Sequence, residues 1–135
     1  SDPGVIAELL ALISRGVRVT IIMPSASDFH YYANMSSLGQ LLSTPHSGNL
    51  RVFLYPKLIH SKVLLIDHDT IFMGSANLIR SSIDEMGEVN VLIRRKRRVI
   101  RTLRDTLRED ILKSRPLHAP PSFLWMTRWL SWLGL

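Results

Sequence analysis

The sequence contains no cysteine among its 135 residues. This absence excludes a disulfide scaffold, a zinc site with cysteine ligands and a thiol nucleophile. The sequence also lacks any uninterrupted run of about 18 to 20 apolar residues, the length that a helix needs to span a bilayer. We therefore expect no segment of this chain to cross a membrane.

The composition is that of a folded domain with an uneven charge distribution. Hydrophobic residues make up 46% of the chain and charged residues 21%, which excludes intrinsic disorder and suits one domain. Residues 1–89 carry 6 Lys+Arg and 8 Asp+Glu, a net charge of −2, whereas residues 90–135 carry 11 and 3, a net charge of +8. Any basic partner surface therefore belongs to the last third of the chain.

Helical and extended patterns alternate along the chain. Apolar residues recur with helical spacing over residues 5–14 and 100–111, and we expect a short helix over 35–44. Runs rich in β-branched residues predict strands over 17–24, 50–55, 62–67, 70–75 and 87–93, with a hairpin turn at His68–Asp69. This mixture predicts an α/β fold, an α-β-α sandwich around a mixed sheet. The strand that would usually precede the first helix is absent.

The most informative stretch is HSKVLLIDHDTIFMGSANL, residues 60–78. On a strand, His60 and Lys62 lie two positions apart and project from the same face, which places an imidazole beside an ammonium group. Such a pair can attack and hold a phosphate group. Gly74 would allow a close backbone approach, and Ser75 and Asn77 would supply neutral donors to phosphate oxygens.

These residues resemble the signature HxKxxxxDxxxxxxGSxN of the phospholipase D superfamily. The matching positions, all at the family spacing, are His60, Lys62, Asp67, Gly74, Ser75 and Asn77. Residues 15–19 also resemble a family segment, and the order of elements is most similar to the C-terminal half of bacterial cardiolipin synthases. Glu88 matches a family glutamate, whereas Met86 stands where cardiolipin synthases usually have an asparagine.

The resemblance implies phosphodiester chemistry through a covalent phosphohistidine, with no metal and no cofactor. One histidine attacks phosphorus, a second histidine from a second copy of the motif protonates the leaving alcohol, and water or another alcohol resolves the intermediate. His60 would be the nucleophile or the general acid, and Glu88 would fix the tautomer of the motif histidine. Lys62, Ser75 and Asn77 would bind the phosphate. Asp67 would either act on the substrate or be a buried carboxylate that anchors the strand end.

A single copy of the motif implies a partner. The second half-site would come either from a second motif in the same protein or from a homodimer partner. The start at Ser1 and the absent first strand favour a lost half. We expect the chain alone to be inactive unless it dimerises, because one histidine cannot both attack and protonate the leaving group in one step.

Two C-terminal features predict contact with an anionic membrane surface. The first is the basic segment, which comprises Arg94, Arg95, Lys96, Arg97 and Arg98. The alternative interpretation of this segment is the solvated start of a helix. Trp125, Trp129 and Trp132 would share one face of a helix that lies at a membrane interface or packs on protein. Prolines at positions 116, 120 and 121 predict a half-domain over residues 1–115 and a linker with a tryptophan-rich tail over 116–135.

The resemblance implies a phosphatidyltransferase of the cardiolipin synthase type, which transfers a phosphatidyl group to an alcohol acceptor. The expected partners are an anionic phospholipid substrate and a membrane surface, with peripheral attachment to the bacterial inner membrane. One alternative is a phospholipase D, or a nuclease of the same superfamily whose partner is nucleic acid. The other alternative is a non-catalytic module with a single relic motif.

Overall fold

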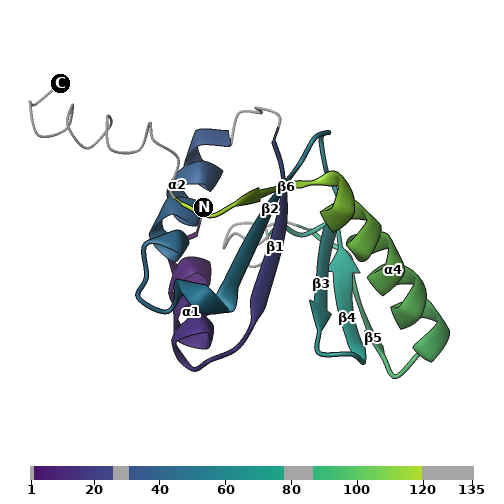
Figure 1. Cartoon of the computed structure of the whole chain (residues 1–135). Helices are drawn as coiled ribbons and strands as arrows, with labels where there is room; N and C mark the ends of the chain where they lie inside the picture. Colours follow the sequence, from purple (N-terminus) through teal and green to yellow (C-terminus); the bar gives the residue numbers. More distant parts are fainter. Residues whose placement is uncertain (1, 26–30, 78–86, 120–135) are drawn as a thin grey trace, which may run out of the picture.

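The computed structural model describes residues 2–25, 31–77 and 87–119. Their strands form two three-stranded sheets, with helices on both sides (Figure 1). The elements in chain order are α1 (Pro3–Ser14), β1 (Val19–Pro24), α2 (Tyr31–Leu42), the 3-10 helix η1 (Ser47–Asn49), β2 (Leu50–Tyr55), β3 (Lys62–Ile66), β4 (Thr70–Gly74), β5 (Asn90–Arg94), α4 (Arg97–Lys113) and β6 (Arg115–Leu117).

The first helix begins and ends where the sequence supplies caps. The carboxylate of Asp2 accepts hydrogen bonds from the backbone N–H groups of Gly4 at 2.7 Å and Val5 at 3.4 Å, and Pro3 occupies the first helical position. The chain leaves the helix at Gly16, whose φ of 86° lies in the left-handed region that favours glycine. These caps set α1 in position to lead into β1.

The first sheet is mixed and has the order β1-β2-β6. β1 and β2 are parallel, with Val19 opposite Leu50, and β6 is antiparallel to β2, with Leu117 opposite Val52. The core of this part of the molecule is a cluster of buried apolar side chains from α1, α2 and β2. Its members are Ile13, Met35, Leu38, Leu41, Leu50, Val52 and Leu54. This cluster explains why the two helices cover one face of the sheet.

The second sheet is an antiparallel meander of β3, β4 and β5. Its register defines two rows of cross-strand neighbours at opposite ends of the sheet. The Lys62 row consists of Lys62, Gly74 and Asn90. The Arg94 row consists of Ile66, Thr70 and Arg94. The turn between β3 and β4 begins at Asp67, which has a φ of 51°, a conformation that aspartate tolerates better than most residues.

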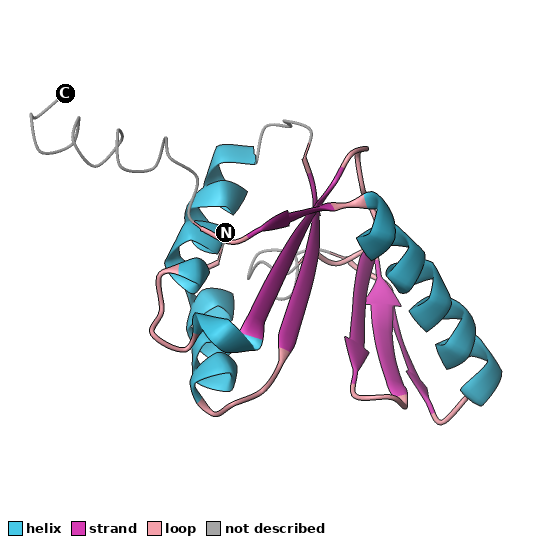
Figure 2. Cartoon of the chain, in the orientation of Figure 1, coloured by secondary structure: helices cyan, strands magenta, loops and turns pink. Residues whose placement is uncertain are grey.

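The long helix α4 lies on the side of the strands opposite α1 and α2 (Figure 2). Its Ile100 is buried, as is Ile71 of β4, and the guanidinium of Arg104 donates to the carbonyl of His68 at 3.4 Å. At its C-terminal end α4 leads directly into β6, so the chain returns from the second sheet to the first. No helix within the described ranges is both long enough and apolar enough to cross a bilayer.

The expected α/β sandwich is confirmed, with three differences in detail. The single mixed sheet that was expected is divided into two sheets, because within the described ranges no strand of the first sheet is paired with a strand of the second. The helix expected over 35–44 begins earlier, at Tyr31. β6 pairs Pro116 and Leu117 with β2, so the sheet extends past the boundary expected at residue 115.

Candidate active site

The motif residues that the sheet register brings together lie at the Lys62 end of the second sheet. His60 lies two residues before Lys62, which begins β3, and Gly74 ends β4 directly beside it. The segment 75–77 leaves β4 at this end, and residues 88–90 approach it to begin β5. The antiparallel register therefore gathers three chain segments around one surface.

His60 and Lys62 are in direct contact. The Nζ of Lys62 lies 2.9 Å from Nε2 of His60 and donates to the His60 carbonyl at 2.8 Å. An ammonium group has only donors, so Nε2 must be the acceptor, and a neutral ring then carries its proton on Nδ1. His60 is exposed and Lys62 is half-buried. The lone pair of Nε2 therefore lies at the surface, where it accepts a hydrogen bond from Lys62.

Ser75 connects the end of β4 to the beginning of β5. Its backbone N–H donates to the carbonyl of Val89 at 3.1 Å, its hydroxyl donates to the carboxylate of Glu88, and the hydroxyl oxygen accepts from the N–H of Val89 at 3.1 Å. A hydroxyl has one proton, and a carboxylate is its strongest available acceptor. The Ser75 proton is therefore committed to Glu88 and is not free for a phosphate.

The expected pairing of Glu88 with His60 is not made here. No hydrogen bond joins the two side chains in the described part of the chain, and the partner of Glu88 is Ser75. The ring of His60 is oriented instead by Lys62. Asn77, the other expected phosphate donor, is exposed and follows Ala76 in the segment that Ser75 fastens.

Gly74 is required by the neighbouring strand. A Cβ at this position would lie 2.7 Å from the Cα of Asn90 and would also collide with the Asn90 Oδ1 and the Val89 carbonyl. The close approach expected at Gly74 is therefore that of β5.

Asp67 lies far from the other motif residues. It begins the turn after β3, five residues beyond Lys62, which on an extended strand is about 16 Å away. Asp67 is exposed, so it is not the buried carboxylate that was one of its two expected roles. Its position suits the turn more than contact with a phosphate at Lys62.

Asn90 is a site residue that the sequence patterns did not single out. It belongs to the Lys62 row, and its Oδ1 accepts from the backbone N–H of Ala76 at 3.3 Å. The signal that could have found it is its place two residues after Glu88, on the same face of an extended segment.

The basic segment occupies the other end of the second sheet. Arg94 ends β5 in the Arg94 row, about 13 Å along the strand from Asn90. The five side chains of the basic segment are exposed and form no ion pair within the described ranges. The ion pairs of α4 lie later in the helix, where Asp105 pairs with Arg108 and Glu109 pairs with Lys113. The first turn of α4 has no acidic residue. The tryptophans at 125, 129 and 132 lie outside the described residues.

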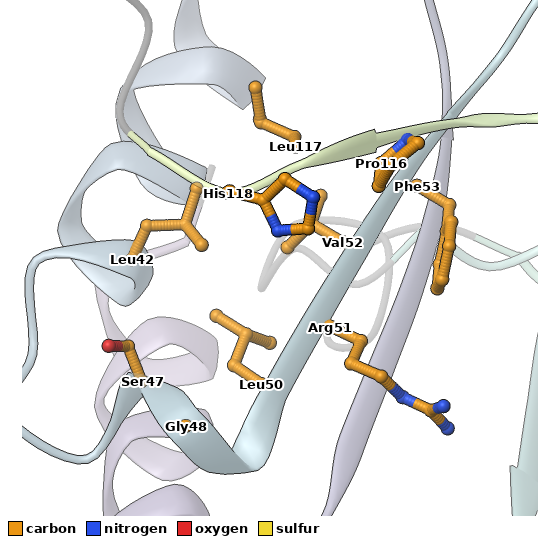
Figure 3. Close-up of a pocket in the computed structure, with 10 residues that line it drawn as sticks. All are labelled: Leu42, Ser47, Gly48, Leu50, Arg51, Val52, Phe53, Pro116, Leu117 and His118. Carbon is orange, nitrogen blue, oxygen red and sulfur yellow. The ribbon is translucent and has the colours of Figure 1, made fainter.

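A cavity of about 420 Å³ lies elsewhere, beside the first sheet. Leu42, Leu50 and Leu117 surround it, and the ring of His118 lies over it (Figure 3). No residue of the motif lines this cavity. The described residues also include no group of three or more metal-ligating side chains that could hold an ion. The motif residues therefore lie outside this cavity. We call the exposed surface at the Lys62 end of the second sheet, which carries His60, Lys62, Ser75 and Asn77, the motif surface.

The fold is that of a phospholipase D-like domain. The family described as "Cardiolipin synthase, PLD-like domain" matches residues 1–111, and the chain belongs to this family. It is 34% identical over 102 residues to a cardiolipin synthase of Listeria innocua, covering 73% of this chain and 20% of the relative. It is 38% identical over 92 residues to cardiolipin synthase A of Pseudomonas aeruginosa, covering 67% and 18%.

The solved structures agree on the fold. Nuc from Salmonella typhimurium, a phospholipase D family member, superposes with a TM-score of 0.70 at 20% identity, over 88% of this chain and 76% of Nuc. This likeness concerns the fold alone. The chain spans about a fifth of the length of the curated relatives it matches.

Proposed function

We propose that this domain supplies one histidine half-site of a phosphatidyltransferase of the cardiolipin synthase type. The observation that carries the proposal is the contact between the Nε2 of His60 and the Nζ of Lys62, at 2.9 Å on an open surface. Attack on phosphorus needs a nucleophile and a positive charge that stabilises the phosphate oxygens. The imidazole lone pair and the ammonium group, which lie side by side, supply these two groups.

In the proposed reaction, Nε2 of one motif histidine attacks the phosphorus of a phosphatidyl donor, and the bond from phosphorus to the alcohol oxygen breaks. The second histidine protonates that oxygen as the alcohol leaves. The same histidine then removes the proton of the acceptor alcohol, whose oxygen attacks phosphorus and releases the first histidine. His60 takes one of these two parts.

Lys62 has two tasks in this proposal. It holds the lone pair of Nε2 until an anionic phosphate arrives, and it then transfers its donors to the phosphate oxygens. Asn77 is proposed to bind a phosphate oxygen, because its side-chain amide lies on the exposed segment after β4. Ser75 takes no direct part in phosphate binding in this proposal, because its hydroxyl proton is donated to Glu88.

The second half-site is proposed to come from the remainder of a longer protein or from a second copy of this chain. The curated relatives are about five times longer than the matched segment, which leaves room for another motif in the same chain. The substrate is proposed to be an anionic phospholipid at a membrane surface, with peripheral attachment through the basic segment and the tail. Because the basic segment lies at the Arg94 end of the sheet, membrane attachment and phosphate chemistry would use separate surfaces.

Product analysis of the paired or full-length protein tests the proposal. We expect vesicles of phosphatidylglycerol to yield free glycerol and a lipid with two phosphatidyl groups. Release of phosphatidic acid and glycerol, without a lipid that carries two phosphatidyl groups, would identify a phospholipase D. Cleavage of an oligonucleotide without any lipid product would identify a nuclease. Absence of turnover on both the phosphatidylglycerol vesicles and the oligonucleotide would favour the non-catalytic module.

A further inference from the structure

Asn90 reaches across Gly74 toward the strand that carries Lys62. The three residues are cross-strand neighbours in one row, so the side chains of Lys62 and Asn90 share a face of the sheet. A Cβ on Gly74 would collide with the Oδ1 of Asn90, which shows that the Asn90 amide lies over the glycine. The side-chain amide of Asn90 is therefore directed toward the motif surface rather than away from it.

The contact that Asn90 makes fixes the segment carrying the expected phosphate donors. Its Oδ1 accepts from the backbone N–H of Ala76 at 3.3 Å. Ala76 is 7% exposed and lies past the last residue of β4, so its N–H has no partner in the strand ladder. A buried N–H without a partner is costly, and Asn90 supplies the partner.

Hydrogen bonds at two positions, Ser75 and Ala76, then attach the segment 75–77 to the start of β5. Ser75 is bonded to Val89 through its backbone N–H and hydroxyl, and Ala76 is bonded to Asn90. Asn77 follows directly, so the direction of its side chain depends on the orientation of the Ala76 peptide. Ser75 alone would leave that peptide free to rotate.

We propose that Asn90 is a positioning residue, which acts through the Ala76 peptide to hold Asn77 beside Lys62 for phosphate binding. This inference rests on the proposed function of the same surface. The residue type matters, because the Oδ1 is committed to Ala76 and the Nδ2 has no partner among the described residues. An aspartate would keep the acceptor but would place a negative charge beside the phosphate.

The test compares Asn90→Ala and Asn90→Asp in the full chain, with inorganic phosphate as the probe. Amide hydrogen exchange of Ala76 is measured by NMR, and phosphate binding is followed by chemical shifts of Lys62 and His60. Asn90→Ala should raise the Ala76 exchange rate about tenfold and weaken phosphate binding. Asn90→Asp should keep the slow exchange yet weaken phosphate binding about two- to fivefold.

Asn49→Ala is the matched control. The amide of Asn49 also bonds a backbone group, the carbonyl of Ile13 at 3.2 Å, but in the first sheet and away from the motif. It should leave both the Ala76 exchange rate and phosphate binding unchanged. Unchanged Ala76 exchange in Asn90→Ala, or unchanged phosphate binding despite faster exchange, overturns the positioning role alone. If the wild-type chain shows no phosphate-dependent shift at Lys62 or His60, the proposed function fails and the positioning role fails with it.

Discussion

At the scale of single residues, position 74 has the most stringent steric requirement. Replacement of Gly74 by alanine would push a Cβ into the backbone of β5 and the side chain of Asn90. We expect the unfolding free energy of Gly74→Ala to fall by about 1–3 kcal/mol, because a packed neighbour must move. Urea denaturation measures this loss.

Gly48→Ala is the control for that substitution. A Cβ on Gly48 would meet no atom within 4 Å, and its backbone is not in the left-handed region. Its unfolding free energy should stay within about 0.5 kcal/mol of the wild type, as for an ordinary surface substitution. Equal stability losses at the two glycines would contradict the close approach of β5.

The tautomer of His60 is a second consequence at this scale. Because Lys62 donates to Nε2, the neutral ring should carry its proton on Nδ1 in the free protein. The ¹⁵N chemical shifts of the ring nitrogens report this directly, and Lys62→Met should allow both tautomers to be populated. A wild-type ring with its proton on Nε2 would rule out Lys62 as the group that holds the lone pair.

Local spacing predicted part of the site and missed the rest for a physical reason. His60 and Lys62 could be found because two residues on one strand face are neighbours wherever the strand lies. The bond of Ser75 to Glu88 spans 13 positions, and that of Ala76 to Asn90 spans 14, so both depend on strand register. Asp67 shows the converse, because a residue inside the motif lies at the far end of its strand.

At the scale of elements, the start of α4 combines unfavourable charges with a proposed anionic partner. Arg97 and Arg98 lie in its first turn, where the helix dipole disfavours cations. Arg97→Gln with Arg98→Gln should raise the unfolding free energy by about 0.5 kcal/mol and weaken binding to anionic vesicles. Urea denaturation and vesicle sedimentation at two salt concentrations measure the two effects.

The matched control removes the same charge later in the helix. Arg101→Gln with Arg108→Gln gives the same net charge, but Arg108 already pairs with Asp105 and both residues lie beyond the first turn. This variant should not gain stability and should retain more vesicle binding. Equal vesicle binding by the two double variants would remove the argument for a membrane surface at the Arg94 end.

The helices and strands were largely predictable, whereas their assembly was not. Apolar spacing located α1, α4 and the strand segments because each buries one face. The division into two sheets follows from strand pairing between distant segments. The pairing of β6 with β2 likewise joins residues more than sixty positions apart, which no local pattern reports.

At the scale of the whole molecule, the proposal requires two half-sites. The chain has one motif, and one histidine cannot serve as nucleophile and acid in the same step. We expect the chain alone to be inactive as a monomer, with any turnover confined to a dimeric fraction. Light scattering coupled to chromatography, with lipid turnover assayed across the peak, measures this, and a fully active monomer would contradict it.

The most direct test of the central claim is phosphodiester turnover by the full-length or paired protein with and without the imidazole of His60. His60→Ala should lower the rate about a thousandfold or more, as loss of a nucleophile or general acid does in other histidine-based sites. His68→Ala, an exposed histidine at the other end of β3, should leave it unchanged. Turnover that is undiminished in His60→Ala would contradict the assignment of this surface as the active site.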